Sequence, residues 1–303
     1  MIYFLLIVNA VVSAVTYIVA KWALFKLAPL ELALARFTLA SICYLPLLAR
    51  RPLPTRRDLP GLCALGLLVV TVFQLSFLTG LSRSTSGHAV LLFALTPVFV
   101  FLLARLRRDE RVTANKAVGM GLAFIGVLAV LFSRGMLSLS ASDRRVLGGD
   151  LLILVSVLCW AVFVVFGKPY AERLGAVSAT GWSTIAGTVI FLPVGLPLCD
   201  WTHFRELPWP GWAAVAYMAI GASIVSFLIN YWAIARVEAS RVAVWMNLQP
   251  VLTALLSWAI YGERLTPAFL LGGVLVMAGV TVMQRGFAPA PRGEGRPGLA
   301  DEH

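Results

Sequence analysis

Charged residues are scarce in this chain, and their scarcity excludes most classes of soluble protein. Of the 303 residues, 13% are charged and 60% are hydrophobic. A soluble domain carries about 25% charged residues, so most of this chain does not face water. The net charge of +11 could suggest a nucleic-acid ligand, but the basic residues form short clusters between long apolar runs. That placement is typical of membrane topology signals, so we expect a lipid bilayer around the chain and no nucleic-acid partner.

Residue types that build metal sites and catalytic sites are also few. The three histidines form no cluster, and the four cysteines lie in or beside apolar runs without metal-ligand spacing. We interpret the cysteines as small packing residues, and we find no nucleophile–base pair. The sequence therefore predicts no metal, no cofactor and no enzymatic activity. These residues are His88, His203, His303, Cys43, Cys63, Cys159 and Cys199.

Acidic side chains are missing from the middle of the apolar runs. All fourteen Asp and Glu residues, Asp150 among them, fall in the expected loops, tails or helix ends. An ionisable group inside a membrane is costly and is by default functional, and proton-driven exporters of cationic drugs commonly need such a carboxylate. The pattern therefore disfavours a proton-coupled drug efflux pump, which we keep as an alternative.

What the chain does contain is a succession of apolar segments with short connections. Because about 20 apolar residues cross a bilayer, we expect an all-α integral membrane protein with ten transmembrane helices. The expected helices are 3–22, 30–49, 60–80, 86–105, 115–133, 148–167, 177–197, 211–232, 240–260 and 267–284. Residues 285–303 are rich in Pro, Gly and Arg, and we expect a disordered tail there.

The distribution of Lys and Arg indicates the orientation. With the N-terminus inside, 16 of the 25 basic residues lie on the cytoplasmic side and 8 lie outside, and Arg36 lies within a helix. The excess favours a multi-pass protein of the bacterial inner membrane with both termini in the cytoplasm.

Two copies of one unit make up the chain. Pro250 follows Pro97 by 153 residues (250 − 97), and Glu263 follows Glu110 by the same number. Gly119 and Gly126 recur with this offset at Gly272 and Gly279. We therefore expect two five-helix repeats, at 1–133 and 148–284. Five is an odd number, so the second repeat enters the membrane from the opposite side, and inverted repeats of this kind are typical of transporters that work by alternating access.

A family resemblance rests on residues spread over nearly the whole length. They are Tyr17-Ile18-Val19-Ala20-Lys21, Ala35-Arg36-Phe37, Gln74-Leu75-Ser76-Phe77, Thr96-Pro97, Asp109-Glu110-Arg111, Trp160 with Lys168, Tyr231-Trp232-Ala233, Gln249-Pro250 and Gly262-Glu263-Arg264. In this order the chain resembles the ten-helix EamA-type branch of the drug/metabolite transporter (DMT) superfamily. The resemblance implies an inner-membrane protein that moves small metabolites, often outward. Two residues depart from the family pattern: Ser13 replaces a tryptophan, and Asp109 stands where glycine is commoner.

Two cations are candidates for substrate binding. Lys21 lies at the outer end of the first helix and Arg36 about two turns into the second, and both could attract a carboxylate or phosphate. Alternatively, Lys21 snorkels to the interface, and Arg36 pairs internally with Glu31 or with a carbonyl group. Together with the missing carboxylate, the cations predict an anionic or amino-acid-like substrate.

Other candidates belong to the helices that carry the repeat motifs. His88 is the one histidine within an apolar run, and an imidazole titrates near neutral pH, so it could carry a proton or only pack. Pro97 and Pro250 remove backbone hydrogen bonds and are expected to act as hinges. We expect the remaining candidates to line a substrate pocket, although each could instead be a packing residue. They are Tyr17, Gln74, Trp160, Asn230, Trp245 and Asn247.

The sequence therefore predicts a secondary transporter of small organic metabolites that works by alternating access. The family resemblance implies export rather than import. A non-transporting membrane scaffold or sensor is a further alternative. The sequence leaves open whether the chain is a monomer or a homodimer.

Overall fold

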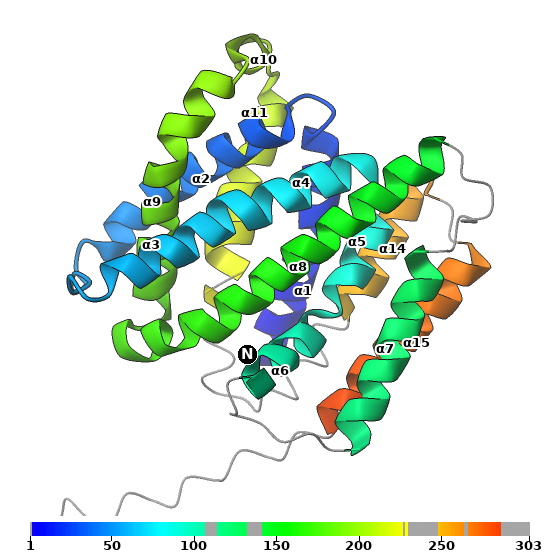
Figure 1. Ribbon diagram of the computed structural model, residues 1–303. Coiled ribbons are helices and arrows are strands. Elements are labelled where there is room, and N and C mark those ends of the chain that lie inside the picture. Colours follow the sequence, from blue (N-terminus) through cyan, green and yellow to red (C-terminus); the bar gives the residue numbers. More distant parts are fainter. Residues whose placement is uncertain are drawn as a thin grey trace, which may run out of the picture.

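Helices make up all the regular secondary structure in the described part of the chain. The computed structural model in Figure 1 describes residues 2–106, 114–131, 141–226, 228–229, 248–263 and 266–285. Two segments, η1 and η3, are π-helices, and η2 is a 3-10 helix. The elements are α1 (Ile2–Ala23), α2 (Pro29–Leu48), α3 (Leu59–Leu67), η1 (Leu68–Phe73), α4 (Gln74–Arg83), α5 (Ser86–Phe93), α6 (Thr96–Leu106), α7 (Ala114–Leu131), α8 (Ala141–Leu174), α9 (Ala176–Gly195), η2 (Leu196–Leu198), α10 (Trp201–Arg205), α11 (Trp209–Ala216), η3 (Tyr217–Val225), α14 (Leu248–Tyr261) and α15 (Pro267–Arg285).

Six helical stretches of the described chain are long and apolar enough to cross a membrane. They are Phe4–Ala23, Pro29–Leu48, Leu59–Arg83, Ser86–Leu103, Arg144–Leu174 and Ala176–Leu198. Three further helical stretches are apolar but shorter, at Ala114–Ala129, Trp209–Val225 and Phe269–Met283. An integral membrane protein built of helices is therefore confirmed. The segment expected at 240–260 is described only from Leu248 onward.

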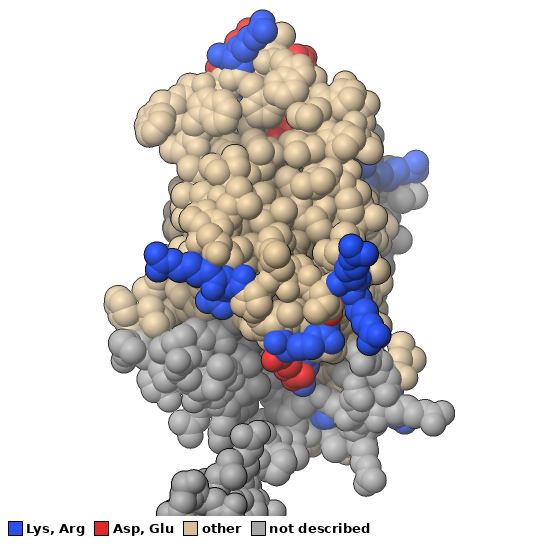
Figure 2. Space-filling view, turned by 90° about the vertical axis from the view of Figure 1, so that its left-hand side faces the viewer, with Lys and Arg blue, Asp and Glu red and all other residues tan. Residues whose placement is uncertain are grey.

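An uncharged surface covers the middle of the face that Figure 2 draws. Figure 2 shows a broad tan surface on one face, with Lys and Arg gathered along its lower edge and mixed charges at the top. Many large apolar side chains are exposed, among them Phe124 and Ile125 of α7 and Val274 of α15. On a soluble protein such a surface would be exceptional, whereas in a bilayer it contacts lipid chains. The charged edges correspond to the two membrane–water interfaces.

The fourth expected helix, 86–105, is found as one membrane-length stretch, Ser86–Leu103, which is interrupted near Pro97. The structure divides it into α5 and α6, with a turn at Ala94 and Leu95. Pro97 has no N–H to donate to the carbonyl of Phe93, four residues earlier. The hydroxyl of Thr96 donates to that carbonyl oxygen instead, over 2.6 Å. The helix is interrupted where proline removes a bond, and a neighbouring side chain satisfies the freed oxygen.

Glycines allow α7 and α15 to pack backbone against backbone, and Figure 1 shows this pair at one side of the bundle. A Cβ atom on Gly119 would lie 2.5 Å from the carbonyl oxygen of Gly279, and one on Gly279 would lie 2.5 Å from that of Gly119. A Cβ atom on Gly126 would lie 2.7 Å from the oxygen of Gly272. The residue numbers rise along one helix and fall along the other, so the two helices are antiparallel. Only glycine permits so close an approach.

Candidate functional site

Arg36 is a buried cation held between helices of the two halves of the chain. It lies in α2 with 7% of its surface exposed. Its Nε donates to the hydroxyl of Ser223 in η3 over 3.0 Å, and its Nη1 donates to Oε1 of Gln74 in α4 over 3.3 Å. Both partners are neutral, and a guanidinium carries five N–H donors. Within the described residues no carboxylate contacts Arg36; its guanidinium lies 5.2 Å from the centroid of the Phe37 ring, so the contacts to its charge there come from neutral groups.

The alternative that Arg36 pairs with Glu31 is wrong. Glu31 begins the same helix, and its carboxylate accepts from the amides of Ala28 and Asp200. It also contacts Nδ1 of His203 in α10 at 3.0 Å. This contact raises the pKa of His203, because the carboxylate accepts a hydrogen bond from the imidazolium and attracts its charge. The Glu31 carboxylate lies at the N-terminus of α2 and is occupied there, so it does not reach Arg36.

Gln74 is oriented by the guanidinium. Because arginine only donates, the amide must present its oxygen to Arg36, and its NH2 group points elsewhere. That nitrogen is buried and has no hydrogen-bond partner in the described part of the chain. The hydroxyl of Thr71, in the preceding turn, is also buried and has no hydrogen-bond partner among the described residues. The Gln74 amide beside Arg36 therefore keeps a buried donor without an acceptor, which is costly.

Both neighbours of Arg36 lie at π-helical segments. Gln74 follows η1 directly, and Ser223 is part of η3. Adding the repeat offset of 153 to residues 68–73 gives 221–226, which overlaps η3 at 217–225. The carbonyl of Ser223 accepts from the hydroxyl of Tyr44 over 2.9 Å, and its own hydroxyl donates to the carbonyl of Met218. Single π-turns inside helices occur frequently at functional sites.

An aromatic cluster adjoins this polar site. Tyr17 of α1 packs edge-on against Phe77 and Phe93, with ring centroids 5.7 and 6.0 Å apart. Phe73, the last residue of η1, contacts Phe93 at 6.2 Å and Trp160 at 5.4 Å. Offset and edge-to-face pairs of this kind stabilise a fixed arrangement of rings. Tyr17 and Trp160, both predicted from the sequence, thus belong to one cluster beside Gln74.

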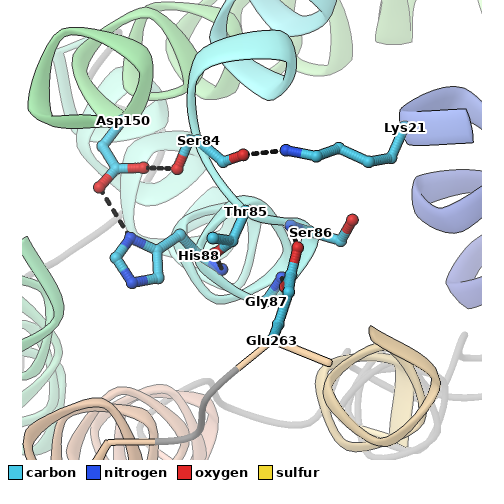
Figure 3. A network of polar contacts seen from close by, with 8 residues as sticks. All are labelled: Lys21, Ser84, Thr85, Ser86, Gly87, His88, Asp150 and Glu263. Carbon is cyan, nitrogen blue, oxygen red and sulfur yellow. Dashed lines mark hydrogen bonds and ion pairs between the residues drawn. The ribbon is translucent and has the colours of Figure 1, made fainter. Parts of the chain in front are cut away.

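A second polar site, drawn in Figure 3, joins α1, α4, α5 and α8. Nδ1 of His88 lies 2.8 Å from Oδ2 of Asp150, and the hydroxyl of Ser84 donates to the other carboxylate oxygen. Nζ of Lys21 donates to the carbonyl of Ser84 and, over 2.9 Å, to that of Leu81. These carbonyls lie at the end of α4, where intrahelical partners run out and the helix dipole favours a cation. Lys21 therefore caps a helix here.

Asp150 contradicts the expectation that every acid lies in a loop, a tail or a helix end. The sixth helix was predicted at 148–167, but α8 spans 34 residues, from Ala141 to Leu174, and contains Asp150 in its interior. Asp150 has no exposed surface. It reaches Ser84 because Gly149 and Gly80 let the two helices approach closely, with a Cβ atom on Gly149 only 2.8 Å from the oxygen of Gly80. The unbroken apolar run after Asp150 was the one signal that could have indicated its burial.

Glu263, from the Gly-Glu-Arg motif in the second half of the chain, caps a helix of the first half. Its carboxylate accepts from the amide of Ser86 at 3.1 Å and from that of Gly87 at 3.3 Å (Figure 3). Thr85 accepts from the amide of His88 over 3.1 Å in the usual N-cap arrangement. An anion at a helix N-terminus is stabilised by the free amides and by the dipole. The motif was recognised in the sequence, but its partner was not.

The predicted site residues thus fall into two groups. Arg36, Gln74, Tyr17 and Trp160 lie around the π-segments, and Lys21 and His88 lie in the network of Figure 3. Pro250 is buried near the start of α14. Three predicted residues and one side chain lie outside the described part of the chain: Asn230, Trp245, Asn247 and the ring of Pro97.

Comparison with known proteins decides the family. The model of the EamA-like transporter family matches residues 1–132 and 147–285. The chain belongs to the EamA-like transporter family. The resemblance noted in the sequence is therefore confirmed, and membership of this family points to a multi-pass membrane transporter of small molecules rather than to an enzyme.

Relatives of this EamA-like transporter bear transporter names. The uncharacterized transporter YyaM of Bacillus subtilis (strain 168) is 28% identical over 283 residues, which cover 92% of both chains. The probable terminal-alkyne amino-acid exporter of Streptantibioticus cattleyicolor is 28% identical over 259 residues, covering 84% of this chain and 83% of that protein. One crystal structure has the same fold, with a TM-score of 0.62 and 17% identity over 92% of this chain and 94% of its own.

Proposed function

We propose that this protein is a secondary transporter of small organic metabolites that carry a carboxylate, including amino acids. The observation that supports this most strongly is Arg36, a buried cation with neutral partners and unused donors. A charge in this environment is costly unless it is paired. A carboxylate offers two acceptor oxygens in the geometry that a guanidinium matches. Bound substrate would then supply the counter-charge that the described protein residues leave out.

A buried donor next to Arg36 supports the same substrate class. The NH2 group of Gln74 is buried without a partner in the described chain. An acceptor-rich group would satisfy it, whereas a cationic group would bring further donors and repel the guanidinium. The amino-acid exporter of Streptantibioticus cattleyicolor, a relative at 28% identity, supports outward transport of a carboxylate-bearing molecule.

The arrangement of the halves supports alternating access. Gly119 contacts Gly279, and Gly126 contacts Gly272. Under the offset of 153, Gly119 corresponds to Gly272 and Gly126 to Gly279, so the two contacts are equivalent and reciprocal. Reciprocal contacts between equivalent residues are the mark of a two-fold axis, and antiparallel helices place that axis across them. The overlap of η1 with η3 under the same offset agrees with this relation. We therefore retain ten helices in two inverted repeats, which can expose one site to either side in turn.

Topology can be tested by labelling. In a background free of the four cysteines, one cysteine replaces Asp109 and another replaces Pro267. For a bacterial inner membrane with both termini inside, we expect a membrane-impermeant maleimide to label Pro267→Cys in intact cells and Asp109→Cys only after permeabilisation. Labelling of both positions from the same side would contradict the inverted repeat.

The substrate class can be tested by binding and by flux. The purified chain is screened by thermal shift against metabolites grouped by charge, and we expect carboxylates and amino acids to stabilise it. The hits are then assayed in proteoliposomes with Arg36→Gln, which keeps hydrogen bonding but removes the charge. The control is Arg173→Gln, at an arginine whose side chain is 59% exposed and paired with Asp58. Unchanged flux in Arg36→Gln would reject the proposed site.

Proton-coupled efflux of cations is the second candidate, and one observation favours it. Asp150 provides the buried carboxylate that the sequence seemed to lack. However, this carboxylate already holds His88 and Ser84, which leaves it less available to a cationic substrate. Stabilisation and flux with organic cations, and not with carboxylates, would establish this alternative. A protein without flux for any class would instead be a scaffold or sensor.

A further inference from the structure

His88 and Asp150 form a buried pair of titratable groups across the two repeats. His88 belongs to α5 of the first repeat and is 4% exposed, and Asp150 belongs to α8 of the second and is fully buried. An ionised carboxylate only accepts hydrogen bonds, so Nδ1 of His88 carries the hydrogen of the 2.8 Å contact. Nε2 makes no hydrogen bond with the described residues and is therefore the nitrogen at which a proton can be added.

Both positively and negatively charged side chains lie near the His88–Asp150 pair. Lys21 acts through the carbonyl of Ser84, and Glu263 is bound to the amides just before His88. The His88 ring stacks on Phe269 of α15, with centroids 5.6 Å apart, so that face is uncharged. Further basic groups lie on the neighbouring helix and at the start of α8 itself: Arg83 of α4 and Arg144 and Arg145 of α8.

We propose that the His88–Asp150 pair binds the proton that this transporter exchanges for its substrate. The inference rests on the proposed transport function and adds the coupling ion and its site. With one ring hydrogen, the imidazole is neutral and the pair carries one negative charge. A proton taken from water at Nε2 makes the pair neutral overall, as an imidazolium beside a carboxylate.

The proton is linked to conformation because the pair is buried where two repeats meet. A net negative charge away from water is costly, whereas a neutral, hydrogen-bonded pair costs much less. The protonated pair therefore favours the closed contact between α5 and α8, and the deprotonated pair favours separation and access of water. Alternating exposure of Arg36 and of this pair would then couple metabolite movement to proton movement.

Proton binding can be measured without knowing the substrate. The full chain contains three histidines, so its ring nitrogens can be observed by NMR after 15N-histidine labelling in nanodiscs, with His88→Gln giving the assignment. We expect Nε2 of His88 to take up a proton when the sample is acidified, while Nδ1 keeps its hydrogen. In Asp150→Asn, His88 should stay neutral under the same conditions. A His88 signal that does not change with pH, or that changes equally in Asp150→Asn, overturns the inference.

Coupling is tested in proteoliposomes that contain a pH-sensitive dye. A carboxylate identified by the thermal-shift screen should drive proton movement in the parent protein. The proton flux in His88→Gln should be at least tenfold smaller. His203→Gln is the matched control, because His203 also contacts a carboxylate but lies on α10. Substrate flux without proton movement in the parent would reject the coupling and leave the transport function standing. Absence of substrate flux in the parent would reject the transport function, while the NMR result would still decide the proton site.

Discussion

Arg36 donates from Nε to the hydroxyl of Ser223 over 3.0 Å, although 187 residues separate them. This bond joins α2 in the first half of the chain to η3 in the second half. The carbonyl of Ser223 also accepts from Tyr44 of α2. Two bonds thus hold a π-helical segment against α2, and a movement that separates α2 from η3 must break them.

Loss of the Ser223 hydroxyl should destabilise the protein and weaken substrate binding. In Ser223→Ala the Nε–H group stays buried without its partner, which costs about 1–3 kcal/mol. The measurement is thermal unfolding with and without a stabilising carboxylate. Ser178→Ala is the control, since the Ser178 hydroxyl is buried without a partner in the described chain and its removal should be neutral or stabilising. Equal effects of the two substitutions would contradict the role of Ser223.

The glycine contact between α7 and α15 predicts a sharp positional effect. Gly119→Ala places a methyl group 2.5 Å from a backbone oxygen, so the helices must move apart, at a cost of about 1–3 kcal/mol. Gly121→Ala lies on the same helix with no atom within 4 Å of the added carbon, and alanine there should be neutral or stabilise by up to about 1 kcal/mol. Unfolding temperatures of the two variants provide the comparison, and the prediction is wrong if they are the same.

Lys21 should behave as a helix cap. Lys21→Met removes charged hydrogen bonds to the carbonyls of Leu81 and Ser84, and each such bond contributes about 1.5–3 kcal/mol. Lys26→Met, five residues later at an exposed position, should leave stability unchanged. Hydrogen exchange at the end of α4 locates the effect. A stable Lys21→Met variant with normal protection there would instead favour the snorkelling interpretation.

The contact between His203 and Glu31 predicts a pH dependence at α10. The pKa of His203 is raised because the Glu31 side chain accepts its hydrogen bond and attracts the positive charge. A raised pKa in the folded state means that the stabilisation is complete below the unfolded value of about 6.5 and is lost as the pH rises through the folded value. Protection of the amides of residues 200–206, corrected for intrinsic exchange, should therefore fall above about pH 6.5. His203→Gln should remove this dependence, and an identical profile in that variant would contradict it.

Sequence patterns were sufficient for the fold class but not for the partners in either site. Arg36, Gln74, Tyr17 and Trp160 could be singled out because polar and aromatic residues are conspicuous in apolar runs. Asp150 was missed because a helix boundary was placed at 148, seven residues after the observed start of α8 at Ala141. The error turned a buried residue into an expected helix end.

The sequence by itself determined that this chain is helical, lies in a membrane, contains motifs that recur at a constant offset and belongs to a transporter family. These properties depend on composition, on the length of apolar segments and on motif order, all of which are local or periodic. Only the tertiary structure decided that His88 meets Asp150 and that Arg36 meets Ser223. A helix that is apolar on all sides carries no pattern that indicates its buried face, so these pairings follow from how the helices pack, including the close approach of glycine backbones.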